Sequence, residues 1–244
     1  NSKSLRSRAA FMKNNKKYHI SFDLELRRNP YDGIYIALEG IDGSGKTTQV
    51  EKLAEYYGAQ GREVVKTREP RKEGIVGDLV HEVLKGERKM SAKALQYLFS
   101  TDRMLHHEDV IEPSLRDGKV VLSDRCLWSA VVYGILDKSE EYGFESANQI
   151  LIAHSILSMY HQFIVPDFTF FLNVSLETSL LRIEEKHKES PKEMYEVREK
   201  VEKVIKGYGW LMQNFGDEIT EIDGEQSIDD VTKEILAKVE VLKK

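Results

Sequence analysis

Short apolar runs recur along the chain, separated by stretches in which apolar residues repeat every three or four positions. The runs lie at 34–39, 64–67, 120–123, 168–173 and 219–222 and are rich in β-branched and aromatic residues. Such runs are typical of buried strands in a parallel sheet. Because strands alternate with helical stretches, we expect an α/β fold with a parallel sheet and helices on both of its faces.

Helical periodicity fills the segments between the runs. Apolar residues at 50, 53, 54 and 57 predict a helix directly after the first strand, and the same spacing predicts helices over 75–84, 94–105, 150–160 and 176–182. Ser190, Pro191 and Glu193 form a capping box, so a long helix is expected from there to Phe215. Ser227 is expected to cap the last helix. The core stripe predicted for that helix is Ile228, Val231, Ile235, Val239 and Leu242.

The first 30 residues differ from the rest of the chain in charge and pattern. Residues 1–17 are polar, basic and aperiodic, so we expect disorder, whereas strict alternation over 18–26 predicts an extra N-terminal strand. Eight basic residues against two acidic ones give residues 1–28 a net charge of +6, which leaves −11 for the remainder. We therefore divide the chain into a basic N-terminal extension, 1–30, and one larger domain, 31–244.

Composition argues against several classes of protein. An acidic body disfavours nucleic-acid binding, and no apolar run is long enough to cross a bilayer. Cys126 is the single cysteine among 244 residues, which rules out an internal disulfide. The cytoplasm is therefore the expected compartment.

A phosphate-binding loop follows the first strand. Residues 40–47 fit the pattern G-x-x-x-x-G-K-[S/T], placed between a predicted strand and a predicted helix. Glycines let the backbone approach phosphate oxygens at the start of a helix, where unpaired N–H groups and the helix dipole attract anions. Lys46 is expected to reach the β- and γ-phosphates, and the Thr47 hydroxyl to ligate Mg²⁺. The predicted ATP-binding residues are Gly40, Asp42, Gly43, Ser44, Gly45, Lys46, Thr47 and Thr48.

Charged residues also follow the other strands. Asp124 ends the apolar run at 120–123, the Walker B arrangement for holding Mg²⁺, and Arg125 next to it is suited to phosphate oxygens. Arg68 follows the second strand. Phe99 and Arg103 lie four residues apart on one face of a predicted helix, a pair suited to stacking and hydrogen bonding with a nucleobase.

Together these motifs resemble those of the thymidylate kinase family. The resemblance runs from about residue 34 to the C-terminus and rests on joint order and spacing. The segments that carry it are 39–49, 67–70, 98–103, Asp124-Arg125 with Ser129 and Tyr133, and Pro166-Asp167 before the aromatic strand. It implies a three-layer P-loop NTPase fold, Mg²⁺- and ATP-dependent phosphorylation of dTMP to dTDP for dTTP synthesis, and a homodimer.

The resemblance also implies residue roles. Phe99 would stack on thymine and Arg103 would hydrogen-bond the base, while Arg68 and Arg125 would grip the monophosphate. Asp42 would contact the sugar 3′-hydroxyl, directly or through the metal, and Tyr133 would crowd a ribose 2′-hydroxyl. The predicted substrate-binding residues are Asp42, Arg68, Phe99, Arg103, Arg125, Ser129 and Tyr133.

The chain departs from the family pattern in its cations and near the acceptor. One branch of the family has a catalytic arginine in the phosphate loop, where this chain has Gly43, and the other carries arginines in a lid. The lid expected at about 183–196 contains lysines but no arginine, and Arg182 and Arg198 flank it. Lysine supplies charge without the bidentate fork. The predicted catalytic residues are therefore Lys46, Arg125, Asp42 and Arg182.

Three departures lie near the expected acceptor site. Cys126 stands where the family usually has an aromatic residue, Ala130 where it usually has a polar residue, and Gly134 where it often has a glutamine. These changes leave two further interpretations open. One is a related kinase that acts on another nucleoside monophosphate or on a nucleoside. The other is a nucleotide-binding module that has lost its kinase activity and works through the N-terminal extension.

Overall fold

A computed structural model describes residues 23–142, 146–188 and 195–242. Within them, five parallel strands form one sheet in the order β2-β3-β1-β4-β5. All five predicted strands are confirmed. They are β1 (Ile34–Glu39), β2 (Val64–Arg68), β3 (Val120–Asp124), β4 (Phe168–Asn173) and β5 (Thr220–Asp223).

The helices connect these strands in the predicted alternation. They are α2 (Lys46–Ala59), α3 (Ile75–Leu84), α4 (Ala92–His106), a π-helical turn (His107–Ile111), α5 (Glu112–Arg116), α6 (Leu127–Tyr142), α7 (Ser146–Tyr160), α8 (Leu176–Lys186), α9 (Arg198–Phe215), a 3₁₀ turn (Gly216–Glu218) and α10 (Ile228–Leu242). None of the described helices is long and apolar enough to cross a membrane.

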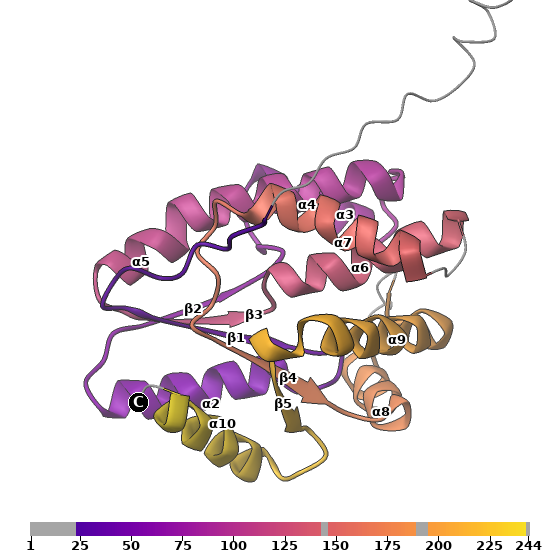
Figure 1. Cartoon of the computed structure of the whole chain (residues 1–244). Helices are drawn as coiled ribbons and strands as arrows, with labels where there is room; N and C mark the ends of the chain where they lie inside the picture. Colours follow the sequence, from indigo (N-terminus) through magenta and orange to yellow (C-terminus); the bar gives the residue numbers. More distant parts are fainter. Residues whose placement is uncertain (1–22, 143–145, 189–194, 243–244) are drawn as a thin grey trace, which may run out of the picture.

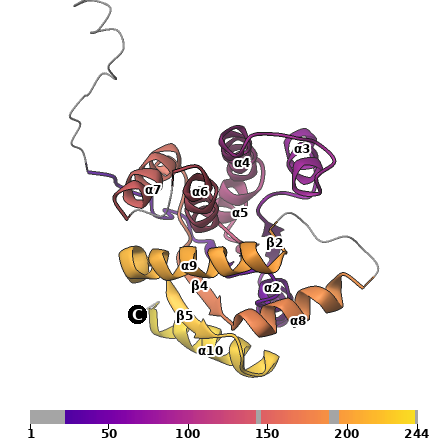
Figure 2. The same cartoon turned by 90° about the vertical axis from the view of Figure 1, so that its right-hand side faces the viewer.

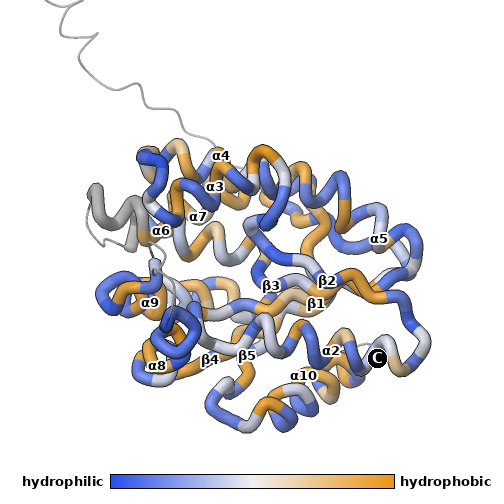
Figure 3. Tube along the Cα trace, turned by 180° about the vertical axis from the view of Figure 1, so that it is seen from behind, coloured by the Kyte–Doolittle hydropathy of each residue, from blue (hydrophilic) through white to orange (hydrophobic). Residues whose placement is uncertain are grey.

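Three layers result, as the strand pattern predicts. Helices α3 to α7 lie on one face of the sheet and α2 and α10 on the other (Figures 1 and 2). Alternate residues of β1 belong to two cores: Tyr35 and Ala37 pack with α6, α7 and α9, whereas Ile36 and Leu38 pack with α2 and α10. Hydrophobic and hydrophilic residues alternate around the outer helices (Figure 3), as expected for helices with one buried face.

Three sequence predictions need correction. Of the core stripe predicted for the last helix, Val231, Ile235 and Val239 are buried, whereas Ile228 and Leu242, at its two ends, are exposed. The extra strand predicted at 18–26 is not formed in its described part, residues 23–26, and a single parallel bridge joins Arg27 to Ile164. The helix predicted to start in the capping box at 190–193 starts only at Arg198, because residues 195–197 are not helical. The capping box itself, 190–193, lies outside the described residues.

Instead of a strand, residues 23–31 form a strap across the helical face. Leu24 and Leu26 pack against the larger core, which explains their alternation in the sequence. Both guanidinium Nη atoms of Arg27 bond the carboxylate of Glu112 at 3.1 Å, and the hydroxyl of Tyr31 donates to the same carboxylate at 2.7 Å. The strap is therefore fixed to the start of α5 by side chains rather than by a sheet ladder.

Buried His107 predicts how stability depends on pH. Its ring stacks on Phe163 with a centroid distance of 4.7 Å, and burial lowers the pKa of His107 to about 4. An unfolded histidine binds its proton more readily, so the free energy of unfolding should fall by roughly 3 kcal/mol as the pH drops from about 6.5 to 4. Chemical denaturation over that range tests this. His107→Phe should flatten the decline and the exposed control His154→Gln should not; equal slopes for all three proteins would contradict the prediction.

Candidate active site

The loop that joins β1 to α2 holds the predicted phosphate-binding residues. Gly40, Gly43 and Gly45 have φ angles of 144°, 78° and 98°, conformations that glycine adopts without steric cost. Lys46 is buried at the start of α2, and its ammonium donates to the carbonyl oxygens of Gly40 at 3.0 Å and Ile41 at 2.8 Å. The loop thus curls around a cation at a helix N-terminus, an arrangement that suits a phosphate chain.

Two oxygen donors meet at the carboxyl edge of the sheet. Asp124 ends β3, and the hydroxyl of Thr47 donates to its carboxylate at 2.5 Å. Mg²⁺ prefers such hard oxygen donors and is usually held by one or two protein carboxylates together with substrate phosphates. No cluster of three or more metal-binding side chains occurs in the described part of the chain. The donor set therefore fits a cation shared with a nucleotide better than a closed, all-protein site.

Arg125 follows β3 in a left-handed conformation. Its φ of 78° costs on the order of 1–3 kcal/mol for a residue other than glycine. The backbone N–H of Arg125 donates to Leu38 O at 2.8 Å, and its carbonyl accepts from the hydroxyl of Ser123 at 2.7 Å. The guanidinium then reaches Asp42 at 2.6 Å. Burial would raise the pKa of Asp42, but Arg125 and neighbouring cations lower it to about 2.

Glu39 is a fully buried carboxylate at the end of β1. Its Oε1 accepts from the backbone N–H groups of Cys126 at 2.9 Å and Ser129 at 3.1 Å. Its Oε2 accepts from the hydroxyls of Ser129 at 2.6 Å and Tyr208 at 2.7 Å. The Tyr208 hydroxyl, on α9, also lies 3.3 Å from Nη1 of Arg125. One carboxylate therefore ties the phosphate-loop strand to the start of α6 and to α9, around the arginine.

A cleft opens beside the phosphate loop, with walls from α3, α4 and α6. Its empty volume, including the open mouth, is about 760 Å³. All the predicted substrate-binding residues line it: Asp42, Arg68, Phe99, Arg103, Arg125, Ser129 and Tyr133. Its wall also holds residues without a predicted role, among them His81, Leu84, Asp102 and Tyr195. The fold thus brings together residues from six separate segments of the sequence.

Arg103 is fixed in the cleft by a buried carboxylate. Its Nε and Nη2 lie 2.7 Å and 2.6 Å from the same oxygen of Glu69, whose other oxygen lies 3.2 Å from Nδ1 of His106. His106 Nε2 in turn contacts the Thr67 hydroxyl at 2.5 Å. Nη1 of Arg103 and Nε of Arg68 are buried without a hydrogen-bond partner. Unpaired buried donors are rare in folded proteins, so both side chains are suited to a ligand in the cleft.

Helix α8 lies against the phosphate loop. Nη1 of Arg182 donates to Gly43 O at 3.1 Å and Nη2 to Gly224 O at 3.4 Å, while the hydroxyl of Ser179 donates to Asp42 O at 2.7 Å. A Cβ atom on Gly43 would lie 2.7 Å from Ser179 O. A side chain at position 43 would therefore require the backbone at Ser179 to shift.

A second hollow, of about 470 Å³, borders the same loop. Its walls come from the loop, the first turns of α2, the connection between β5 and α10, and Arg182. The residues are Ser44, Gly45, Thr48, Gln49, Arg182, Gly224, Gln226, Ile228 and Val231. Cleft and hollow thus both border the phosphate loop.

Of the two arginines that flank the predicted lid, only Arg182 lies at the phosphate loop. The side chain of Arg198 is 60% exposed and lies 3.6 Å from Glu202 on its own helix. Arg182 therefore remains the candidate substitute cation, as predicted, and Arg198 does not.

The predicted lid, 183–196, is described only in part. Its first residues continue α8, and Lys186 and His187 both contact the buried carboxylate of Glu196 at 3.0 Å. Lys192, a further lid lysine, lies outside the described residues. Lys186 is among the cations that lower the pKa of Asp42, so this lysine acts electrostatically on the phosphate loop although its ammonium is paired with Glu196.

Comparison with known proteins identifies the family of this chain. The family model described as thymidylate kinase matches residues 38–235, most of the chain. The chain belongs to the thymidylate kinase family. Membership makes it a phosphotransferase, a dTMP kinase that uses ATP.

Individual thymidylate kinases align over most of their length. The thymidylate kinase of Sulfurihydrogenibium sp. is 31% identical over 206 residues, which cover 84% of this chain and 95% of the relative. A probable thymidylate kinase of Pyrococcus horikoshii is 33% identical over 212 residues, 85% of this chain and 96% of the relative. The structure of thymidylate kinase from Candida albicans, described as having broad substrate specificity, superposes with a TM-score of 0.72 at 25% identity, covering 86% of this chain and 92% of that one.

Several residues that organise this thymidylate kinase site escaped prediction. The sequence could have indicated Glu39, because it is the only charged residue of an otherwise apolar strand. Tyr208 had none, since a tyrosine on the apolar face of a helix is typical of core packing. Glu69 and His106 act through residues distant in sequence, and pattern analysis does not detect such pairs.

Proposed function

We propose that this dTMP kinase binds dTMP in the cleft and ATP across the phosphate loop, and transfers the γ-phosphoryl group in line between them. The bond of 2.6 Å between Arg125 and Asp42 supports this most directly, because it joins the cleft wall to the phosphate loop. Phosphoryl transfer needs positioning and charge neutralisation rather than a protein nucleophile. Two polyanions are brought together here, and the site offers cations to both.

For the acceptor, we propose that Arg68 and Arg125 bind the monophosphate, Phe99 stacks on the base and Arg103 hydrogen-bonds its edge. The contact of two Arg103 nitrogens with one oxygen of Glu69 supports the last role, since it fixes the guanidinium group at the cleft and leaves its buried Nη1 without a hydrogen-bond partner. Tyr133 supports the site differently. Its ring lies under the guanidinium of Arg125, 5.3 Å from ring centroid to Cζ, which restricts that side chain.

For the donor, we propose that the backbone of residues 40–47 cradles the phosphates, with Lys46 near the β- and γ-oxygens and the adenine moiety in the hollow beside Arg182. Thr47 and Asp124 would hold Mg²⁺. When bound, Mg²⁺ neutralises charge on the phosphate oxygens. Arg182 lies within hydrogen-bond distance of the loop carbonyl at Gly43, which supports its proposed role as the cation that replaces a lid arginine.

The acceptor is tested by an activity screen. ADP production from Mg-ATP is measured with dTMP, dUMP, dGMP, dCMP, UMP and thymidine under identical conditions. We expect the highest kcat/KM with dTMP. A higher value with thymidine would remove Arg68 and Arg125 from their proposed role, and a higher value with another monophosphate would place this chain among kinases of a different acceptor.

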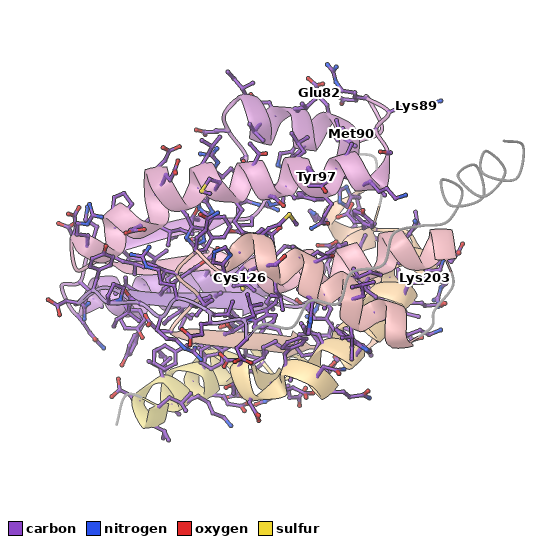
Figure 4. All side chains as sticks on the ribbon, turned by 45° about the horizontal axis from the view of Figure 1, so that its top comes forward. Glu82, Lys89, Met90, Tyr97, Cys126 and Lys203 are labelled. Carbon is purple, nitrogen blue, oxygen red and sulfur yellow. The ribbon has the colours of Figure 1, made fainter. Side chains whose placement is uncertain are left out.

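Phe99→Ala should raise the KM for dTMP about 10- to 100-fold, because stacking of a base on an aromatic ring contributes roughly 1–3 kcal/mol. The KM for ATP should stay within about twofold. Tyr97→Ala is the matched control, since Tyr97 lies on the same helix, is 69% exposed and sits at the outer surface (Figure 4). Steady-state kinetics with each substrate varied in turn measures both constants. An equal rise for both substrates would contradict the stacking role.

The homodimer and the cytoplasmic location, both expected from the sequence, stay predictions. Sedimentation velocity of the full chain at micromolar concentration measures the first. A single species of twice the chain mass would support it, and a monomer throughout would contradict it.

A further inference from the structure

Some buried polar atoms without a hydrogen-bond partner belong to residues of the acceptor cleft, and others belong to Tyr35, Gln96 and His107 outside it. In the described part of the chain, three cleft-lining side chains each carry one: Nε of Arg68, Nη1 of Arg103 and Nε2 of His81. Because buried polar groups are nearly always paired, such an atom indicates a partner that the protein itself does not supply. Arg68 and Arg103 already have a proposed partner in the substrate, and His81 has none.

His81 lies on α3, one turn before Leu84, which also lines the cleft. Residues three apart share a helix face, so both side chains belong to the same wall. The acidic residue that lines the cleft nearby, Asp102, is engaged elsewhere: its two carboxylate oxygens accept from the backbone N–H and the Nε of Arg71 at 2.9 Å and 3.0 Å. The wall on α3 therefore combines an imidazole without a partner at Nε2 and an apolar side chain.

The cleft is lined both by residues next to the phosphate loop and by residues of α3. Its phosphate end is marked by Asp42 and Arg125, next to the loop that starts α2. Figures 1 and 2 show α3 on the opposite side of the sheet from α2. Because His81 and Leu84 line the same cleft as Arg125, a nucleotide whose phosphate lies at Arg125 can place the part of its base remote from the sugar against the wall on α3. In thymine that part carries the 4-keto oxygen and the 5-methyl group.

We propose that His81 is a further specificity-determining residue of the acceptor cleft, and that its Nε2 donates a hydrogen bond to the 4-keto oxygen of thymine. The inference rests on the acceptor site proposed above. A keto oxygen accepts two hydrogen bonds, so Arg103 and His81 share it. Leu84, beside His81, packs against the 5-methyl group. An amino group at position 4, as in cytosine, meets a donor from Arg103 and is disfavoured.

His81→Leu removes the ring nitrogen and keeps an apolar side chain in its place. It should raise the KM for dTMP about 3- to 10-fold, the effect of one hydrogen bond between neutral groups. The KM for ATP and kcat should stay within about twofold. His81→Gln, whose amide nitrogen can donate in place of Nε2, should return the KM for dTMP to within about twofold of the wild type. The control is Glu82→Gln, because Glu82 is the next residue of α3, pairs with Arg88 and lies at the outer surface (Figure 4).

A second acceptor separates hydrogen bonding from packing. The 5-methylpyrimidin-2-one analogue of dTMP lacks the 4-oxygen, so wild type and His81→Leu should show the same KM for it. If His81→Leu raises the KM for dTMP and the KM for the analogue equally, His81 is a packing residue and the proposal is overturned. An unchanged KM for dTMP would also overturn it.

Two results would instead contradict the acceptor site itself. These are a wild-type protein that does not phosphorylate dTMP, or a Phe99→Ala variant whose KM for dTMP is unchanged. If the wild type and Phe99→Ala behave as expected and His81→Leu leaves the KM for dTMP unchanged, only the proposed role of His81 is contradicted.

Discussion

Arg125→Lys should lower kcat/KM for dTMP by about 10³-fold while leaving the KM for ATP within about threefold. The variant keeps the positive charge and loses the planar fork. In the wild type, Nη2 bonds Asp42 at 2.6 Å while Nη1 lies 3.1 Å from Ser129 Oγ and 3.2 Å from Gly40 O. A single ammonium cannot span these positions and also face a phosphate. Loss of one positioned donor to a charged transition state commonly costs 10²–10³-fold, and loss of a catalytic arginine up to 10⁵-fold.

The same experiment guards against a folding defect. Arg125 is buried, so a damaged core would also lower activity; thermal unfolding and ATP binding of the variant, measured alongside the kinetics, reveal such damage. Arg116→Lys is the control for the chemical change, since the Arg116 side chain is 63% exposed. Near-normal turnover by a folded Arg125→Lys variant would contradict the proposed grip on the acceptor.

Lys46→Met should lower kcat by about 10³-fold, because it removes the cation expected at the β- and γ-phosphates. Lys46 donates to Gly40 O and Ile41 O, so its ammonium is directed into the loop. Lys52→Met, on the same helix with a side chain 40% exposed, is the control. A coupled assay of ADP release at saturating substrates measures kcat for all three proteins.

The pH profile gives an independent check on Lys46. Burial and the positive charge of Arg125 lower the pKa of Lys46 to about 8. Lysine is charged below its pKa, so kcat/KM for ATP should be constant up to about pH 8 and fall above it. Lys46→Arg keeps its charge at higher pH, so any residual activity should lose this break. Lys46→Met with near-normal kcat, or a wild-type profile flat to pH 9.5, would contradict the role.

The strands and the phosphate loop were predictable because their signals are local. An apolar run such as 168–173 is complete within a few residues, and the loop pattern between strand and helix defines its own backbone. Local signals were not enough to predict the acceptor residues, because Phe99, Arg103 and Arg125 come together only in the folded chain. Their joint order in the sequence carried that information through the family resemblance, and their roles remain proposals.

Other features could not be read from the sequence for identifiable physical reasons. Helix α6 begins with residues 127–136, which are almost all buried, so it lacks the one-sided period that reveals a helix. The strap at 23–31 alternates like a strand because Leu24 and Leu26 face the core, yet ion pairs and packing hold it rather than a ladder. In both cases the pattern records burial correctly, while tertiary packing decides the backbone conformation.

The position of Cys126 has a consequence for how this sequence can diverge. Its backbone N–H bonds Glu39 at 2.9 Å and its backbone carbonyl accepts from Nη2 of Arg103 at 3.3 Å, so the peptide groups at this residue connect the two ends of the acceptor cleft. Main-chain groups are the same in every amino acid except proline. The side chain at 126 adds a contact of its own, because the buried thiol donates to the same oxygen of Glu39 at 3.3 Å. A substitution at 126 therefore keeps the main-chain connection but loses the thiol bond and must fit the volume of the core.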